Sequence, residues 1–130
     1  MSNWTHVAAV ARIDSVVGLT PELDFEKIFG KTLEYGDSQR KWWEQEEHPE
    51  RYLPMGSEGS LKMMVWTDPD PCNMARYTVS IFGDLRHHDS PQEIVDWFKE
   101  KLKDLWIRQA TITVENEYYG TVNWTYEREG

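Results

Sequence analysis

The fold is decided by residues 75–127, ARYTVSIFGDLRHHDSPQEIVDWFKEKLKDLWIRQATITVENEYYGTVNWTYE. Alternation of apolar and polar residues predicts one strand over Arg76–Asp84 and two more over Gln109–Glu115 and Thr121–Glu127. Between the first two strands, Pro91–Trp106 has helical periodicity. Because an amphipathic helix buries its apolar stripe against a neighbouring layer, this stretch predicts a sheet with one covered face.

The helix prediction depends on a start signal and a stripe. Ser90 and Glu93 have the spacing of a capping box, in which each side chain accepts a hydrogen bond from the other residue's backbone N–H. Pro91 stands where a missing N–H costs nothing. The predicted apolar stripe consists of Ile94, Val95, Phe98, Leu102, Leu105 and Trp106.

The N-terminal half is expected to contribute a strand, a short helix and another strand. His6–Ile13 carries small or apolar residues on both faces, which is typical of a central strand. Thr20 and Pro21 open a predicted short helix that ends at Gly30. Leu61–Thr67 returns to strand alternation. The apolar residues of the short helix are Leu23, Phe25, Ile28 and Phe29.

The predicted order is strand, helix, strand, strand, helix, strand, with a last strand after the Tyr118–Gly120 turn. Right-handed crossovers place both helices on one face of a mainly antiparallel sheet, which is the ferredoxin-like split βαβ arrangement of the α+β class. We expect a single domain over residues 1–130, with an irregular insertion at about 31–60. The uncovered face would carry threonine and aromatic residues, so a dimer through that face or an edge strand is expected.

The charge balance is acidic: 23 Asp and Glu against 14 Lys and Arg give a net charge of −9. Direct nucleic-acid binding is therefore not expected, because phosphate neutralisation needs a basic face. Cys72 is the single cysteine, which rules out an intramolecular disulfide and favours a reducing cytoplasm. No export signal or apolar run of membrane length occurs, so we expect a cytoplasmic protein with no membrane partner.

Seven tryptophans are many for a chain of 130 residues. Trp42 and Trp43 stand in the insertion beside Glu46 and Glu47. Exposed aromatic residues anchor protein interfaces, and carboxylates attract a basic partner, so these four are the predicted partner-binding residues. A core position is expected for Trp66, Trp97 and Trp106, whereas either core or interface is open for Trp124, Tyr118, Tyr119 and Tyr126.

A second candidate site precedes the helix. Arg86, His87, His88 and Ser90 could hold a phosphate or carboxylate, because cationic side chains and free helix N–H groups would act together. An ordinary polar loop explains the same residues. A metal site would need ligands from His6, Asp84 or Asp89.

No catalytic residue, metal or cofactor is predicted, since no motif of catalytic, metal-binding or nucleotide-binding spacing occurs. If the protein were an enzyme, the candidates would be His87, His88 and Asp84, with a histidine as general base.

Four segments resemble those of small proteins carried by phages and prophages of Gram-positive bacteria. The resemblance implies a short acidic protein that acts in the host cytoplasm, where such proteins often inhibit a defence protein; it carries over no active site. The segments are NWTHV (Asn3–Val7), PMGSEGSL (Pro54–Leu61), SIFGDLR (Ser80–Arg86) and VNWTY (Val122–Tyr126).

The first functional hypothesis is a non-enzymatic inhibitor that binds a host protein stoichiometrically through the acidic and aromatic residues. A host protein that itself binds nucleic acid is one candidate partner. The alternative is an oligomeric sponge for a cyclic or linear nucleotide signal, in which the Arg86–His88 segment holds phosphate and an aromatic side chain stacks on the base. A small histidine-dependent enzyme is the third hypothesis.

Overall fold

The computed structural model describes residues 3–16, 23–32, 47–56, 59–67, 74–88 and 90–127. They form an α+β arrangement of strands, two helices and one 3-10 turn. In chain order the elements are β1 (Trp4–Val16), α1 (Phe25–Phe29), η1 (Pro49–Arg51), β2 (Lys62–Thr67), β3 (Met74–Arg86), α3 (Pro91–Leu102), β4 (Trp106–Asn116) and β5 (Gly120–Thr125).

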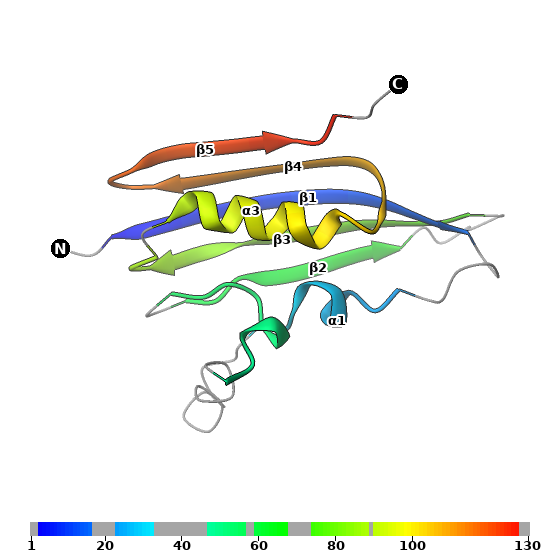
Figure 1. Ribbon diagram of the computed structural model, residues 1–130, viewed down its shortest axis with the longest axis horizontal. Helices are drawn as coiled ribbons and strands as arrows, with labels where there is room; N and C mark the ends of the chain where they lie inside the picture. The colour runs from blue at the N-terminus through cyan, green and yellow to red at the C-terminus, as the bar shows by residue number, and fades with distance from the viewer. Residues whose placement is uncertain are drawn as a thin grey trace.

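The strands make one five-stranded sheet in the order β2-β3-β1-β4-β5, and every neighbouring pair is antiparallel. β1 lies in the middle, as its two apolar faces predict (Figure 1). Ala9 faces Ile81 on β3 and Ile112 on β4, so the centre of the sheet is built from residues distant in the chain.

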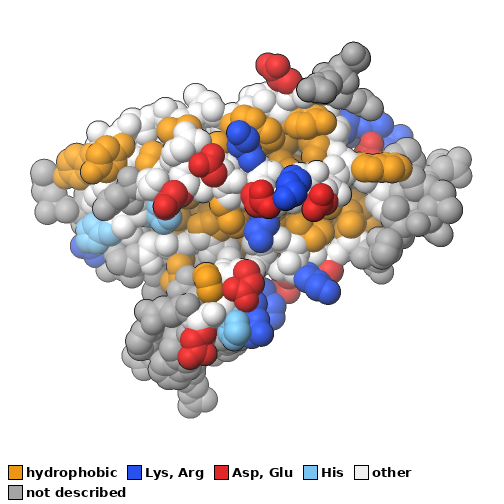
Figure 2. Space-filling model, viewed as in Figure 1, with side chains coloured by type: hydrophobic (Ala, Val, Ile, Leu, Met, Phe, Trp, Pro, Cys, Tyr) orange, Lys and Arg blue, Asp and Glu red, His pale blue; other side chains and the backbone are white. Residues whose placement is uncertain are grey.

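Both helices cover the same face of this sheet (Figure 1). The rings of Phe29 on α1 and Phe98 on α3 lie 6.4 Å apart and join the two helices above the strands. Strand residues alternate as the sequence predicts: Ala9 and Ile81 are buried under the helices, whereas Val10 and Phe82 face the other side. The outer side of α3 carries charged groups of both signs, as a solvated helix face does (Figure 2).

The predicted helix Pro91–Trp106 is too long. α3 ends at Leu102, and Trp106 begins β4 with 59% of its surface exposed. The physical reason is strand pairing: Trp106 faces Asp14 and Ile107 faces Ile13 on β1, and that ladder takes these residues into the sheet. The predicted stripe is confirmed at its first positions and ends early; its buried members are Ile94, Val95, Phe98 and Leu102.

Other local predictions need correction. The capping box is wrong, because the Ser90 side chain makes no cap hydrogen bond, although Pro91 does stand in the first turn. Trp66 is not in the core: it faces Thr78 on the uncovered side of the sheet and is 53% exposed. α1 begins later than predicted, with Asp24 as its N-cap, while its end at Gly30 is confirmed.

Trp97 and Trp124 are partly buried and pack against the core. The Trp124 ring contacts Phe98 edge-on, with 6.2 Å between the ring centroids. Of the two positions open for Trp124, core or interface, the structure therefore shows the margin of the core. Cys72 lies outside the described residues. Within those residues, no helix is both long and apolar enough to cross a membrane.

Candidate functional site

Of the predicted partner-binding residues, Trp42, Trp43 and Glu46 lie outside the described part of the chain. Glu47 is described and exposed, just before η1. Their placement therefore stays a prediction.

Backbone hydrogen bonds join Lys31 to Arg51 and Leu53 at the base of the insertion. The Lys31 N–H donates to the Arg51 carbonyl, and the Leu53 N–H donates to the Lys31 carbonyl, both at 2.9 Å. Gly30 permits this close approach, since a Cβ there would lie 2.4 Å from the Tyr52 carbonyl carbon and its φ is +115°. Lys31 and Tyr52 therefore lie side by side next to α1.

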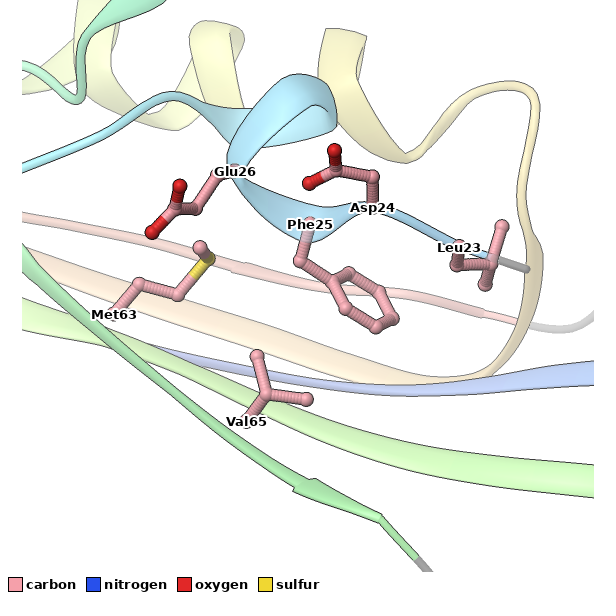
Figure 3. A pocket seen from close by; sticks show the side chains of 6 residues that line it. All are labelled: Leu23, Asp24, Phe25, Glu26, Met63 and Val65. Carbon is pink, nitrogen blue, oxygen red and sulfur yellow. The ribbon is translucent and has the colours of Figure 1, made fainter.

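A pocket of about 520 Å³ lies between α1 and β2 and is open to solvent (Figure 3). Met63 and Val65 point from β2 toward α1, and Phe25 points from α1 toward the sheet (Figure 3). These three side chains make an apolar floor. The carboxylates of Asp24 and Glu26 belong to its rim; the full lining is Leu23, Asp24, Phe25, Glu26, Met63 and Val65.

The two rim carboxylates differ in what holds them. Asp24 accepts from the Lys27 backbone N–H at 3.3 Å as the N-cap of α1, which fixes its position. Glu26 is exposed in the first turn. Both residues also line a second hollow of about 550 Å³ on the side of the insertion base, with Lys27, Lys31, Glu50, Arg51 and Tyr52.

Glu50 adds a third carboxylate to this region. A hydrogen bond from its own backbone holds the pKa of Glu50 below the ordinary value, and His48 Nδ1, 3.3 Å from its carboxylate oxygen, acts in the same direction. The second hollow thus carries three carboxylates and three cations, Lys27, Lys31 and Arg51, whereas the pocket between α1 and β2 has only the carboxylates of Asp24 and Glu26 among the charged groups of its described lining.

β2 is an edge strand and forms one wall of the pocket. In the part of the chain that the structure describes, it pairs with β3 alone. Its residues are unusually exposed for a strand: 66% for Met64 and 41% for Val65. An edge with free N–H and C=O groups can accept an additional strand from another polypeptide.

The Arg86–His88 segment, predicted to bind an anion, has a structural role in the fold. His87 has a positive φ of 57°, and its N–H donates to the Asn3 carbonyl at 2.7 Å. The His88 carbonyl accepts from Thr5 Oγ1 at 2.7 Å, and Asn116 Nδ2 donates to the same Thr5 oxygen at 2.8 Å. The ordinary-loop interpretation therefore accounts for the backbone of Arg86–His88.

The buried Thr5 and Asn116 were missed by the sequence reasoning. Asn116 Oδ1 also accepts from the backbone N–H groups of Tyr118 and Tyr119, at 2.8 and 2.9 Å. An asparagine just before a Tyr-Tyr-Gly turn is a known turn signal and could have indicated this role. Its side chain ties the turn between β4 and β5 to the loop before α3.

The side chain of His88, in the predicted anion site, is not fully used in hydrogen bonding. His88 Nδ1 is buried and has no hydrogen-bond partner among the described residues. Ser90, also predicted there, is half-buried and makes no cap hydrogen bond with its side chain.

The structure brings Asp84 to His6 and not to His87 or His88. His6 Nδ1 lies 2.6 Å from Asp84 Oδ1 on neighbouring strands, and this hydrogen bond raises the pKa of His6, with Glu117 and Glu115 adding to the effect. The two side chains are 47% and 64% exposed, so the pair stands in solvent without an enclosed reaction site. Among the described residues, no cluster of three His, Cys, Asp or Glu could hold a metal ion.

Protein-family models, curated proteins and solved structures gave no match to this chain. The pocket beside β2, the edge of β2 and the uncovered face of the sheet are the surface features that bear on function.

Proposed function

We propose that this protein is a non-enzymatic inhibitor that binds one protein partner stoichiometrically, and that the partner lays a basic and apolar extended segment along β2. The observation that carries the proposal is the pocket between α1 and the edge strand, with its apolar floor and two rim carboxylates. We also propose that the sheet is a ferredoxin-like split βαβ with β5 added, which the order β2-β3-β1-β4 supports.

Strand addition sets the chemistry of the partner. An added strand alternates its side chains between the two sheet faces, so every second residue would enter the pocket above Met63 and Val65. Apolar side chains would fill the floor beside Phe25, and Lys or Arg side chains would reach the carboxylates of Asp24 and Glu26. The partner segment is therefore expected to mix basic and aliphatic residues.

Net charge favours the same class of partner. A charge of −9 steers basic surfaces toward the protein, and nucleic-acid-binding proteins carry such surfaces. On the evidence of the sequence alone, we keep Trp42, Trp43, Glu46 and Glu47 as part of the proposed interface. A phage-encoded protein that blocks a host defence protein in the bacterial cytoplasm is the biological role we propose.

The sharpest test uses neighbouring residues that point to opposite faces of β2. Val65→Arg places a positive charge in the pocket and should abolish binding, whereas Met64→Arg adds the same charge on the other face and should leave binding within about twofold. The probe is a synthetic peptide that alternates lysine and valine, with a glutamate and valine peptide as the control.

Binding is followed through the backbone amide signals in NMR spectra. The lysine peptide should shift the amide signals of β2 and α1, and its affinity should fall as the salt concentration rises. In the Val65→Arg variant, the same peptide should leave these signals unshifted. Equal shifts from both peptides, or shifts that avoid β2, would contradict the proposal. Proteins captured from a bacterial lysate by the original chain and lost by Val65→Arg would then identify the natural partner.

A nucleotide sponge is the second candidate, favoured by the unpartnered, buried His88 Nδ1 close to the start of α3. Arg86, His87, His88 and Ser90 would hold the phosphate, and an aromatic side chain would stack on the base. Calorimetry with a panel of cyclic and linear nucleotides tests this candidate. Binding heat from one nucleotide, reduced in the Arg86→Ala variant, would support the sponge. The absence of binding heat with every nucleotide, in a folded sample, would exclude the sponge.

A further inference from the structure

The face of the sheet opposite the helices has no covering element among the described residues (Figure 1). The sheet therefore leaves large apolar side chains in water on that face. They are Val10, Met64, Trp66 and Phe82, and they lie on the three adjacent strands β1, β2 and β3. Scattered exposed apolar residues need no explanation, whereas a contiguous group on a flat face marks an interface.

Strand register shows that this group is contiguous. Phe82 lies between Lys62 and Ala8 in one row across the sheet, and Ser80 lies between Met64 and Val10 in the next row. Trp66 follows on the same edge beside Thr78. On the other side of β1, the rows continue into the threonines of β4 and β5, Thr111, Thr113 and Thr125.

The face is large enough for a stable interface. Between Trp4 and Asp14 it measures roughly 33 Å along β1 at ~3.3 Å per residue, and the four spacings of ~4.8 Å between the five strands give a width of roughly 19 Å. The projected area is then roughly 600 Å², and the accessible area of the side chains is greater; a standard interface uses about 800 Å² per partner.

Charges on the face are separated along the strands. At one end, Asp84 and Glu115 flank His6 in a single row. At the other end, Arg12 and Arg76 follow the apolar rows. The row of His6 is thus acidic, and the rows of Arg12 and Arg76 are mainly basic. Three charges depart from this division: Arg86 beside Trp4, Lys62 beside Phe82, and Asp14 beside Arg76, which forms an ion pair with Arg108.

We propose that a second copy of this chain covers the face, related by a two-fold axis that lies between the two sheets and runs across the strands. Rotation about such an axis reverses the strand direction, so the acidic end of each copy meets the basic end of the other. An axis along the strands would instead set Arg12 against Arg12 and Glu115 against Asp84. The first arrangement keeps one like-charge contact, Arg76 against Arg86 in the outermost rows, but brings Arg12 to the acidic row, so charge favours it.

The axis crosses β1 between Ala8 and Val10, the centre of the apolar rows. Val10 of one copy then faces Ala8 of the second copy, and Phe82 faces Ser80, so large side chains meet small ones. Arg12 lies opposite His6 of the second copy, with Asp84 and Glu115 on the two neighbouring strands of the same row. The helices remain on the two outer surfaces, and the β2 edge and its pocket stay accessible, so this inference is independent of the proposed function.

The test is a charge exchange between Arg12 and Glu115. Within one chain these residues cannot meet: Glu115 is the neighbour of His6, and Arg12 stands further along β1 by roughly 20 Å at ~3.3 Å per residue. Any energetic coupling between them therefore reports a contact between two copies.

Molecular mass is measured by analytical ultracentrifugation over a range of concentrations. The original chain should be a dimer; Arg12→Glu and Glu115→Arg should each weaken it about tenfold or more, and the double variant should recover most of that loss. Phe82→Glu should give a monomer whose helix and sheet content, by circular dichroism, is unchanged. A monomeric original chain, a dimer that survives Phe82→Glu, or a double variant that is no tighter than the single variants would each overturn the proposal.

Discussion

Phe98 is the residue whose removal should reveal the buried side of α3 most clearly. Its side chain is fully buried, and its ring contacts Phe29 at 6.4 Å and Trp124 at 6.2 Å between centroids. Phe98→Ala should destabilise the fold by about 4 kcal/mol, because the variant loses the buried ring and leaves a cavity where two helices and β5 meet. For a chain of 130 residues, that lowers the melting temperature by roughly 12–20 °C.

Trp106→Ala is the matched control. The sequence pattern sets Trp106 on the same helical stripe as Phe98, whereas the structure has it exposed at the start of β4. Its removal should cost about 1 kcal/mol or less. Thermal unfolding followed by circular dichroism compares the two variants. Equal losses of stability would refute the assignment of the helix end, and an unchanged melt for Phe98→Ala would refute the packing of α3.

Two further predictions concern buried and exposed polar pairs. Asp84→Asn should bring the pKa of His6 down toward its ordinary value, as measured by NMR titration. At pH values below the unfolded pKa of histidine, the pair stabilises the fold by a few tenths of a kcal/mol. This stabilisation is lost as the pH rises through the raised pKa of His6 in the folded state. Asn116→Ala should destabilise the fold by about 2–3 kcal/mol in a denaturant titration, because Thr5 loses a hydrogen bond and two backbone N–H groups of the following turn lose their acceptor.

The sequence predicts the strands and most of the core because both have a strong local period. Alternation along β1 and β3 alone determines which residues face the helices, and the central place of β1 follows from the small residues Ala8, Ala9 and Ala11. The covered face and the threonine-rich open face are confirmed for the same reason.

Local periodicity fails where distant residues decide. Leu105 and Trp106 continue the helical period of α3, yet pairing with β1 ends the helix at Leu102. Trp66 is apolar and stands in a strand, so its sequence position did not indicate exposure. It is exposed because it lies beside Thr78 on the uncovered face of the sheet.

The candidate sites were less accessible to sequence reasoning because their members are far apart in the chain. The pocket joins Asp24 and Phe25 to Met63 and Val65, and no motif links these two segments. Asp84 is close in sequence to His87, but β-sheet register places it beside His6 instead. The sequence identified residue types suited to binding, while strand order determined which of them meet.

β2 connects the two proposals, because its alternation gives each of its faces a separate partner. Val65 points into the pocket that we assign to a basic segment, and Met64, its neighbour, points to the face that we assign to a second copy. Val65→Arg should therefore remove peptide binding and leave the dimer intact, while Met64→Arg should weaken the dimer and leave peptide binding within about twofold. If each variant lost both peptide binding and dimer formation, the pocket and the open face would act as a single binding surface. The protein would then bind its partner only after a second copy had completed the site.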